Sequence, residues 1–182
     1  MPAPARLVSA EEFARIPDDD CQYELVEGRV VRVSLPGGVH GALTTRMAIL
    51  LGQWVEAHGL GAVMSPAGFR LATNPDTVRG PDVAFIRRER IPETGLPEGF
   101  WPGPPDLAIE IRSPGDRPSE ILAKVDDYLT RGVQLVWVVD PRSKTVTVYR
   151  RLLPPVTRGL EETLDATDVV PGFVCEVRRI FD

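Results

Sequence analysis

The sequence predicts an α/β fold in which a mixed central β-sheet is flanked by helices and extended by β-hairpins. Two observations predict it. Short apolar or alternating segments bounded by Gly and Pro are typical of strands, and longer segments carry apolar residues at helical spacing. These segments are interspersed along the chain, which favours one mixed sheet. With 182 residues and 43% hydrophobic content, the chain fits a single domain, residues 1–182, that can bury roughly 70% of its unfolded surface.

The first third of the chain predicts a short helix, a hairpin and a long helix. The short helix begins with a capping box, Ser9 followed by Glu12, and ends before three consecutive aspartates. The hairpin turns at Glu27-Gly28, and the long helix stops before Gly59. The predicted ranges are 9–16 for the short helix, 23–27 and 29–35 for the hairpin, and 39–55 for the long helix.

The rest of the chain predicts strands around one further helix, which has Pro118 in its first turn and ends at Gly132. Segment 87–105 is rich in Pro and Gly and longer than most connections, so it is predicted to be a mobile functional loop or a partner-binding arm. Pro171-Gly172 between apolar stretches predicts a last strand pair. The other strands are predicted at 62–64, 69–71, 82–86, 106–112, 134–139 and 145–149.

Charge and cysteine content limit the classes of protein. The net charge of −5 argues against a protein that coats nucleic acid through an excess of Lys and Arg. It does not exclude a nuclease, because a site that gathers carboxylates for a metal is itself acidic. Cys21 and Cys175 lie far apart, which favours reduced thiols and a cytoplasmic location. No apolar run approaches the roughly 20 residues needed to cross a bilayer, so no membrane association is expected.

Lysine is rare in this chain. Of 21 basic residues, only Lys124 and Lys144 are lysines. A compact, titratable ammonium differs chemically from the fork of a guanidinium. A lysine that occurs in such an Arg-rich chain is therefore a candidate for a chemical role.

Two acidic residues stand out because they belong to strands predicted to be buried. Glu110 interrupts a strand otherwise built of Ile, Leu and Ala, and Asp82 opens an apolar strand after Gly80-Pro81. An ionised carboxylate in apolar surroundings is costly unless it is paired or binds metal. On neighbouring strands, the two would be suited to a hard divalent cation. The alternative is that Glu110 pairs with an Arg and Asp82 caps a turn.

Lys124 is the candidate cation for this site. At 100° per residue it falls beside Val125 and Tyr128, at the edge of the buried face of its helix. Its stem could lie on the core while its ammonium reaches the sheet, where it could stabilise charge on a phosphate and orient an attacking water. The alternative is a lysine whose ammonium extends into solvent.

Further segments complete a pattern that spans almost the whole chain. They are 23–28 (YELVEG), His40, 81–85 (PDVAF), 105–114 (PDLAIEIRSP), Lys124 with Tyr128, 132–133 (GV), 136–141 (VWVVDP) and 171–173 (PGF). In this order the set resembles the Uma-two family of restriction-endonuclease-like proteins, within the PD-(D/E)XK nuclease superfamily. The resemblance implies a restriction-endonuclease-like fold, a homodimer, and hydrolysis of DNA with one or two Mg²⁺ (or Mn²⁺) ions.

The resemblance also implies roles for individual residues. Asp82, Glu110 and the backbone carbonyl of Ile111 would hold the metal. The superfamily pattern has a Lys two residues after the Glu, where this chain has Arg112. In the Uma-two family a helix Lys is thought to take that place, and Lys124 matches it. Arg112 could instead bind phosphate with both arms of its guanidinium.

Glu24, His40 and Ser113 complete the set of candidate site residues. The resemblance makes Glu24 a third acid that ligates a metal or orients water, and the alternative is an ion pair with an Arg of the hairpin. His40 lies in the apolar sector of its helix, where a core histidine is the simpler interpretation. Ser113 lies in the matching segment beside Arg112.

We therefore expect a magnesium-dependent DNA endonuclease with Asp82, Glu110 and Lys124 as the core of its site and Glu24 assisting. A bound metal would lower the pKa of water and stabilise the pentacovalent phosphate. Two other classes stay open. A non-catalytic binding or regulatory module could keep this fold and dock a partner through segment 87–105. A hydrolase of RNA or of small phosphodiesters could use the same residues.

Overall fold

The computed structural model describes residues 6–17, 21–33 and 35–182. At its centre lies a six-stranded sheet with the order β11-β10-β9-β8-β6-β3. Strands β8 and β9 are parallel, and the other neighbours are antiparallel, so the sheet is mixed as the sequence predicts. Its strands are β3 (Gly61–Met64), β6 (Val83–Arg87), β8 (Leu107–Ile111), β9 (Leu135–Asp140), β10 (Thr145–Arg150) and β11 (Val156–Arg158).

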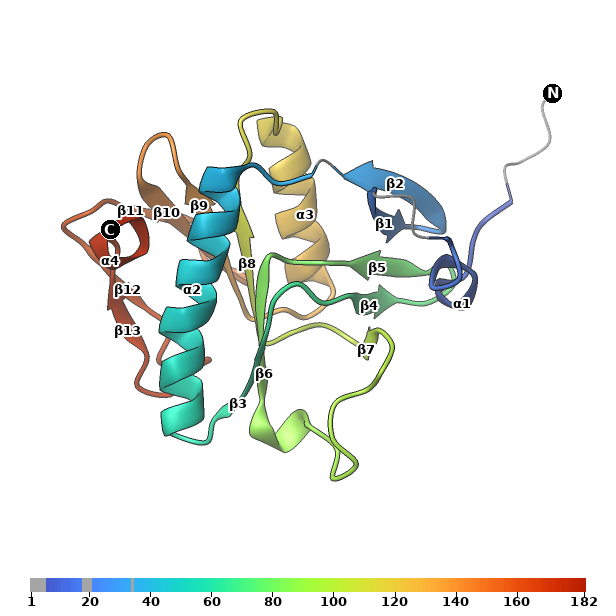
Figure 1. The fold of residues 1–182 in the computed structure, drawn as a ribbon, viewed down its shortest axis with the longest axis horizontal. Coiled ribbons are helices and arrows are strands. Elements are labelled where there is room, and N and C mark those ends of the chain that lie inside the picture. Colours follow the sequence, from blue (N-terminus) through green and yellow to red (C-terminus); the bar gives the residue numbers. More distant parts are fainter. Residues whose placement is uncertain (1–5, 18–20, 34) are drawn as a thin grey trace.

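A second sheet, of five strands in the order β2-β1-β5-β4-β7, lies to the right of the central sheet in Figure 1. Strand β5 leads through Gly80-Pro81 directly into β6, so the chain passes from one sheet to the other at that point. The hairpin turns at Glu27-Gly28 as predicted, and both residues have positive φ (48° and 72°). The strands are β1 (Gln22–Val26), β2 (Arg29–Val33), β4 (Phe69–Ala72), β5 (Thr77–Arg79) and β7 (Trp101–Pro102).

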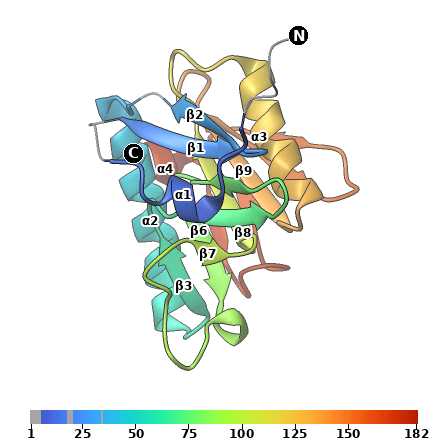
Figure 2. The ribbon, with the colours of Figure 1, turned by 90° about the vertical axis from the view of Figure 1, so that its right-hand side faces the viewer.

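Two helices cover opposite sides of the central sheet, as Figures 1 and 2 both show. Helix α2 (Gly38–Ala57) and helix α3 (Pro118–Thr130) each bury one apolar stripe at helical spacing. The α2 stripe consists of Leu43, Met47, Leu51 and Val55, and the α3 stripe of Ile121, Val125 and Tyr128.

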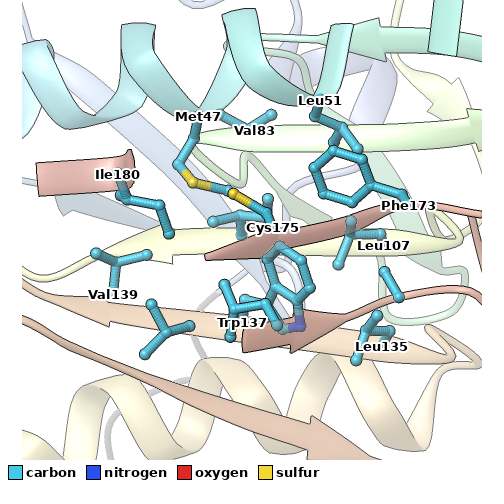
Figure 3. Packing of buried hydrophobic residues seen from close by; sticks show 14 of the residues in the cluster. Met47, Leu51, Val83, Leu107, Leu135, Trp137, Val139, Phe173, Cys175 and Ile180 are labelled. Carbon is cyan, nitrogen blue, oxygen red and sulfur yellow. The ribbon is translucent and has the colours of Figure 1, made fainter. Parts of the chain in front are cut away.

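The core on the α2 side joins that helix, the central sheet and the carboxyl-terminal segment. Figure 3 shows Met47 and Leu51 of α2 packed with Val83, Leu107 and Trp137 of the sheet and with Phe173, Cys175 and Ile180 from the end of the chain. That end forms the predicted strand pair, β12 (Thr163–Asp165) with β13 (Val174–Glu176), followed by α4 (Arg178–Phe181).

The side chains of β8 alternate between the two core clusters. Leu107, Ile109 and Ile111 belong to the cluster under α2, whereas Ala108 belongs to the cluster under α3. Because successive strand residues point to opposite faces, Glu110 lies on the α3 face. This agrees with the alternation in the sequence, which predicts Leu107, Ile109 and Ile111 on one face and Ala108 and Glu110 on the other.

Several elements differ from the prediction. Strands β5, β7 and β11 and helix α4 were not expected, because segments of two to four residues carry no measurable periodicity. The first helix, α1 (Ala10–Phe13), is shorter than expected but has the predicted capping box. The three aspartates expected to end it, and Ser34 in the expected second hairpin strand, lie outside the described residues.

Segment 87–105 is tied to the body of the protein at both ends. It contains a 3-10 turn, η1 (Arg88–Arg90), and strand β7, whose Trp101 is 4% exposed. The guanidinium of Arg90 pairs with the buried carboxylate of Asp106, with Nη1 2.9 Å from Oδ2. The expectation of a mobile loop or docking arm therefore applies to its middle, residues 92–99, where most side chains are exposed.

Among the described residues, no helix is both long enough and apolar enough to cross a membrane.

Candidate active site

Asp82 and Glu110 lie on neighbouring strands, as the sequence predicts. Asp82 immediately precedes β6, which pairs with β8 in the register Val83 to Ile109. The backbone N–H of Ile111 donates to Asp82 Oδ2 at 2.7 Å. The Asp82 carboxylate therefore lies at the end of β8 beside Glu110, whose side chain is 6% exposed.

Both oxygens of Glu110 accept hydrogen bonds from helix α3. The hydroxyl of Tyr128 donates to Oε1 at 2.6 Å, and the ammonium of Lys124 donates to Oε2 at 3.2 Å. Lys124 and Tyr128 are four residues apart, so they share one face of the helix. The lysine stem lies at the edge of the buried face and its ammonium reaches the sheet, which agrees with the helical spacing.

Glu24 joins the same cluster from the second sheet. Its Oε1 lies 3.2 Å from Lys124 Nζ, and its Oε2 accepts from Arg79 Nη1 at 2.7 Å. The register of β1 with β5 sets Leu25 opposite Val78 and hence Glu24 opposite Arg79. The sequence left open an ion pair between Glu24 and an Arg of its own hairpin. The observed partner is Arg79, which belongs to the adjacent strand β5.

Arg79 connects this carboxylate to helix α3. Its side chain is 8% exposed, and its guanidinium also binds Asp127. Two linked ion pairs therefore fix α3 against the second sheet, one helical turn from Lys124. They join Arg79 to Glu24 and to Asp127.

The charges of this cluster shift its protonation equilibria. Burial, together with the neighbouring Asp82 and Glu24, raises the pKa of Glu110 from 4.5 to about 7, although Lys124 and Tyr128 oppose the rise. Burial alone would raise the pKa of Glu24 as well. The positive charges of Lys124 and Arg79 outweigh burial, so the pKa of Glu24 is lowered. Burial alone would lower the pKa of Lys124. The negative charges of Glu110 and Glu24 outweigh burial, so the pKa of Lys124 is raised. Lys124 is therefore a stable cation between two acids.

His40 lies beside Asp82 rather than in the apolar core. Its Nε2 is 3.1 Å from Asp82 Oδ2, and its Nδ1 is 3.4 Å from Thr44 Oγ1. The hydrogen bond to Asp82 raises the pKa of His40 above its ordinary value. The His40 side chain is 11% exposed, has partners for both ring nitrogens and lines the cleft described below, so its polar contacts are satisfied as expected of a core histidine. A role for His40 in catalysis stays a prediction.

Arg112 directly follows β8, and its side chain is directed to the adjacent strand and not to Glu110. Its Nη1 donates to Asp140 Oδ2 at 2.6 Å at the end of the adjacent strand β9. Ser113 follows it, and the Ser113 N–H donates to Asp116 Oδ2 at 2.7 Å. The side chain two residues after Glu110 is thus used in an ion pair with Asp140.

The cluster opens into a cleft of about 1320 Å³. The cleft runs from the start of α2 and the start of α3 to the β1–β2 hairpin, and its lining includes Glu24, His40, Asp82, Glu110, Ile111, Ser113 and Lys124 but not Arg112. Its volume exceeds the roughly 300–1,000 Å³ of ordinary small-molecule sites. A segment of a polymer would fit it better than a metabolite.

Comparison with known proteins decides the family. The model of the Uma2 family, described as "Putative restriction endonuclease", matches residues 10–178. The chain belongs to the Uma2 family. A solved structure from Anabaena variabilis, titled as a putative nuclease belonging to DUF820, has the same fold, with a TM-score of 0.85 and 21% sequence identity. That match covers 96% of this chain and 97% of the other. No curated protein matches this chain.

The donor set of this Uma2 protein fits a divalent cation only in part. Within the described ranges, no three His, Cys, Asp or Glu side chains are grouped so that they could hold a metal ion. The Ile111 carbonyl can contribute, because the N–H and C=O of one strand residue point to the same side and the Ile111 N–H points to Asp82. Two carboxylates, one carbonyl and water would suit Mg²⁺, which keeps several waters when bound.

Sequence reasoning missed Arg79 and the role of the Tyr128 hydroxyl. For Tyr128 a signal existed, because a buried tyrosine usually finds a partner for its hydroxyl, and it lies one turn after Lys124. For Arg79 the signal was weaker, because its strand has only three residues.

Proposed function

We propose that this Uma2 protein is a metal-dependent DNA endonuclease. The observation that carries the proposal is a shortage of permanent positive charge around buried acids. Glu24 and Glu110 share the ammonium of Lys124, and Arg79 divides its guanidinium between Glu24 and Asp127. Asp82 pairs with His40, which carries a positive charge only when protonated. A divalent cation beside Asp82 and Glu110 would supply the missing charge, and the family description points to phosphodiester hydrolysis.

Each residue then has a distinct task. Asp82, Glu110 and the Ile111 carbonyl would hold one or two Mg²⁺ (or Mn²⁺) ions, which when bound would lower the pKa of water and neutralise charge on the phosphate. Lys124 positions the attacking water or neutralises developing charge. Glu24 holds the Lys124 ammonium in place, since the distance of 3.2 Å and its ion pair with Arg79 favour this role over direct metal binding.

Calorimetric titration with Mn²⁺ tests the metal site directly. The wild-type protein should bind Mn²⁺, and Glu110→Gln should lose both this binding and the Mg²⁺-dependent nicking of supercoiled plasmid. Glu98→Gln, at an exposed position in segment 87–105, is the matched control and should retain both. Unchanged Mn²⁺ affinity in Glu110→Gln would exclude Glu110 as a ligand.

One observation favours the non-catalytic module as a second candidate. Glu24 and Glu110 both have partners within the protein, namely Arg79, Lys124 and Tyr128, without any ion. A wild-type protein that gives no heat with Mn²⁺ would support this module. Plasmid DNA, RNA and a chromogenic phosphodiester offered side by side separate the DNA endonuclease from hydrolases of other substrates.

Homodimer formation rests on the family resemblance alone. We propose it as the state in solution, and light scattering combined with size-exclusion chromatography measures it. A mass of 20.0 kDa, that of one chain, would contradict it.

A further inference from the structure

The hydrogen-bond donors around Asp82 and Glu110 are distributed unevenly between the carboxylate oxygens. On Glu110, the Tyr128 hydroxyl donates to Oε1 at 2.6 Å, and Lys124 lies at Oε2. On Asp82, the Ile111 N–H at 2.7 Å and the His40 Nε2 at 3.1 Å both reach Oδ2. Within the part of the chain that the structure describes, no contact of this kind reaches Oδ1. Both oxygens of Glu110 are therefore held by neighbours, but only one oxygen of Asp82.

The groups that hold Glu110 Oε1 and Asp82 Oδ2 have little freedom to move. Tyr128 is 0% exposed and packs in the core cluster between α3 and the central sheet. The Ile111 N–H belongs to the backbone of a central strand. The Lys124 ammonium at Glu110 Oε2 is different, because it is carried by a flexible four-carbon stem that can yield to an incoming ion.

We propose that Tyr128, assisted by His40, is a positioning residue that limits each metal-binding carboxylate to one oxygen, so that the site selects Mg²⁺ or Mn²⁺ over Ca²⁺. This inference rests on the proposed function. Ca²⁺ takes six to eight oxygen ligands and often binds carboxylates through both oxygens, whereas Mg²⁺ requires six and keeps several waters. Two single oxygens and the Ile111 carbonyl give few protein ligands, which suits the smaller ion.

The test measures ion selectivity rather than activity. Dissociation constants for Mn²⁺ and Ca²⁺ are determined by calorimetry on the wild-type protein and on Tyr128→Phe, which removes only the hydroxyl. The variant frees Glu110 Oε1, so the preference for Mn²⁺ should narrow by roughly tenfold, the scale on which outer-shell partners alter metal affinity. Tyr149→Phe is the matched control, because Tyr149 packs against the same core cluster and should leave the preference unchanged.

Each outcome decides a separate point. An unchanged preference in Tyr128→Phe, even with a lower melting temperature, overturns the inference, because a purely structural tyrosine would alter stability alone. Absence of Mn²⁺ binding in the wild-type protein refutes the proposed function and this inference with it. Should Tyr128→Phe fail to fold, His40→Ala removes one of the two contacts on Asp82 Oδ2. A smaller preference for Mn²⁺ over Ca²⁺ in His40→Ala supports the inference, and an unchanged preference overturns it.

Discussion

Lys124 Nζ lies 3.2 Å from Glu110 Oε2, although one residue belongs to a helix and the other to a central strand. The intervening turn and the Pro118 start of α3 bring the helix across the end of β8. The strand position two residues after Glu110 holds Arg112, which pairs with Asp140 instead. The cation beside Glu110 therefore comes from the helix and not from the strand position two residues further on.

Replacing Lys124 tests its role in turnover. Lys124→Met keeps the apolar stem and removes the charge, so turnover should fall by roughly 10²-fold or more, the scale on which one electrostatic stabiliser acts. Mn²⁺ binding should persist, because Asp82, Glu110 and Ile111 remain. Plasmid nicking under saturating metal measures the change, and Lys144→Met, at the other lysine and exposed in a turn, is the control. Lys124→Arg should rescue poorly, because the larger planar head cannot occupy the same space.

Arg112 offers the converse experiment. Because its guanidinium binds Asp140 and lies outside the lining of the cleft, Arg112→Met should leave metal binding intact and reduce turnover far less than Lys124→Met. Steady-state rates of the two variants on one plasmid decide between them. The assignment of the helix lysine is wrong if Arg112→Met abolishes turnover while Lys124→Met does not.

The stability of the metal-free protein should depend on pH through Glu110. Its pKa is about 7 when folded and about 4.5 when unfolded, so the unfolded chain loses this proton first as pH rises. The contribution of Glu110 to stability therefore falls between pH 4.5 and 7, by on the order of 3 kcal/mol, and is constant outside that window. Glu110→Gln lacks this pH-dependent loss. The free energy of unfolding of the variant, relative to wild type, should therefore increase from pH 5 to pH 8. Urea denaturation in EDTA measures it, and an equal effect of the variant at both pH values would contradict the assignment.

Arg79 should be needed for stability because it is a buried cation shared by two acids. Arg79→Met leaves Glu24 and Asp127 without this partner, and removal of one member of a buried ion pair costs about 3–5 kcal/mol. Arg158→Met removes one partner of the exposed pair with Glu162 and should change stability by less than about 1 kcal/mol. Chemical denaturation compares the two variants, and similar losses would show that the Arg79 network contributes little.

Binding of DNA should weaken with salt despite the negative net charge. Each phosphate contact releases counterions, so the logarithm of the affinity should fall linearly with the logarithm of salt concentration. Arg32 and Arg117 are exposed in the cleft lining, and replacing either by Ala should lower the slope by about one. Fluorescence anisotropy with Lys124→Met in Mg²⁺ measures the slope while cleavage is slowed. Arg151→Ala, at an exposed arginine outside the lining, is the control, and an affinity independent of salt would argue for a docking module.

The sequence by itself determined the main elements and the acid pair. Period-two alternation in β8 placed Glu110 opposite Leu107 and Ile109, and helical spacing placed Lys124 beside Tyr128. These patterns are local, because each depends on backbone geometry within one element. The turn at Glu27-Gly28 was predictable for the same reason, since few residues adopt its positive φ values.

Only the tertiary structure decided which of these groups meet. Glu24 and Glu110 are far apart in the sequence and lie in different sheets, and they come together because β5 continues through Gly80-Pro81 into β6. The register of β1 with β5 sets Arg79 opposite Glu24, and the docking of α2 brings His40 to Asp82. Such contacts depend on the register and packing of distant elements, which hydrophobic periodicity within a segment does not encode.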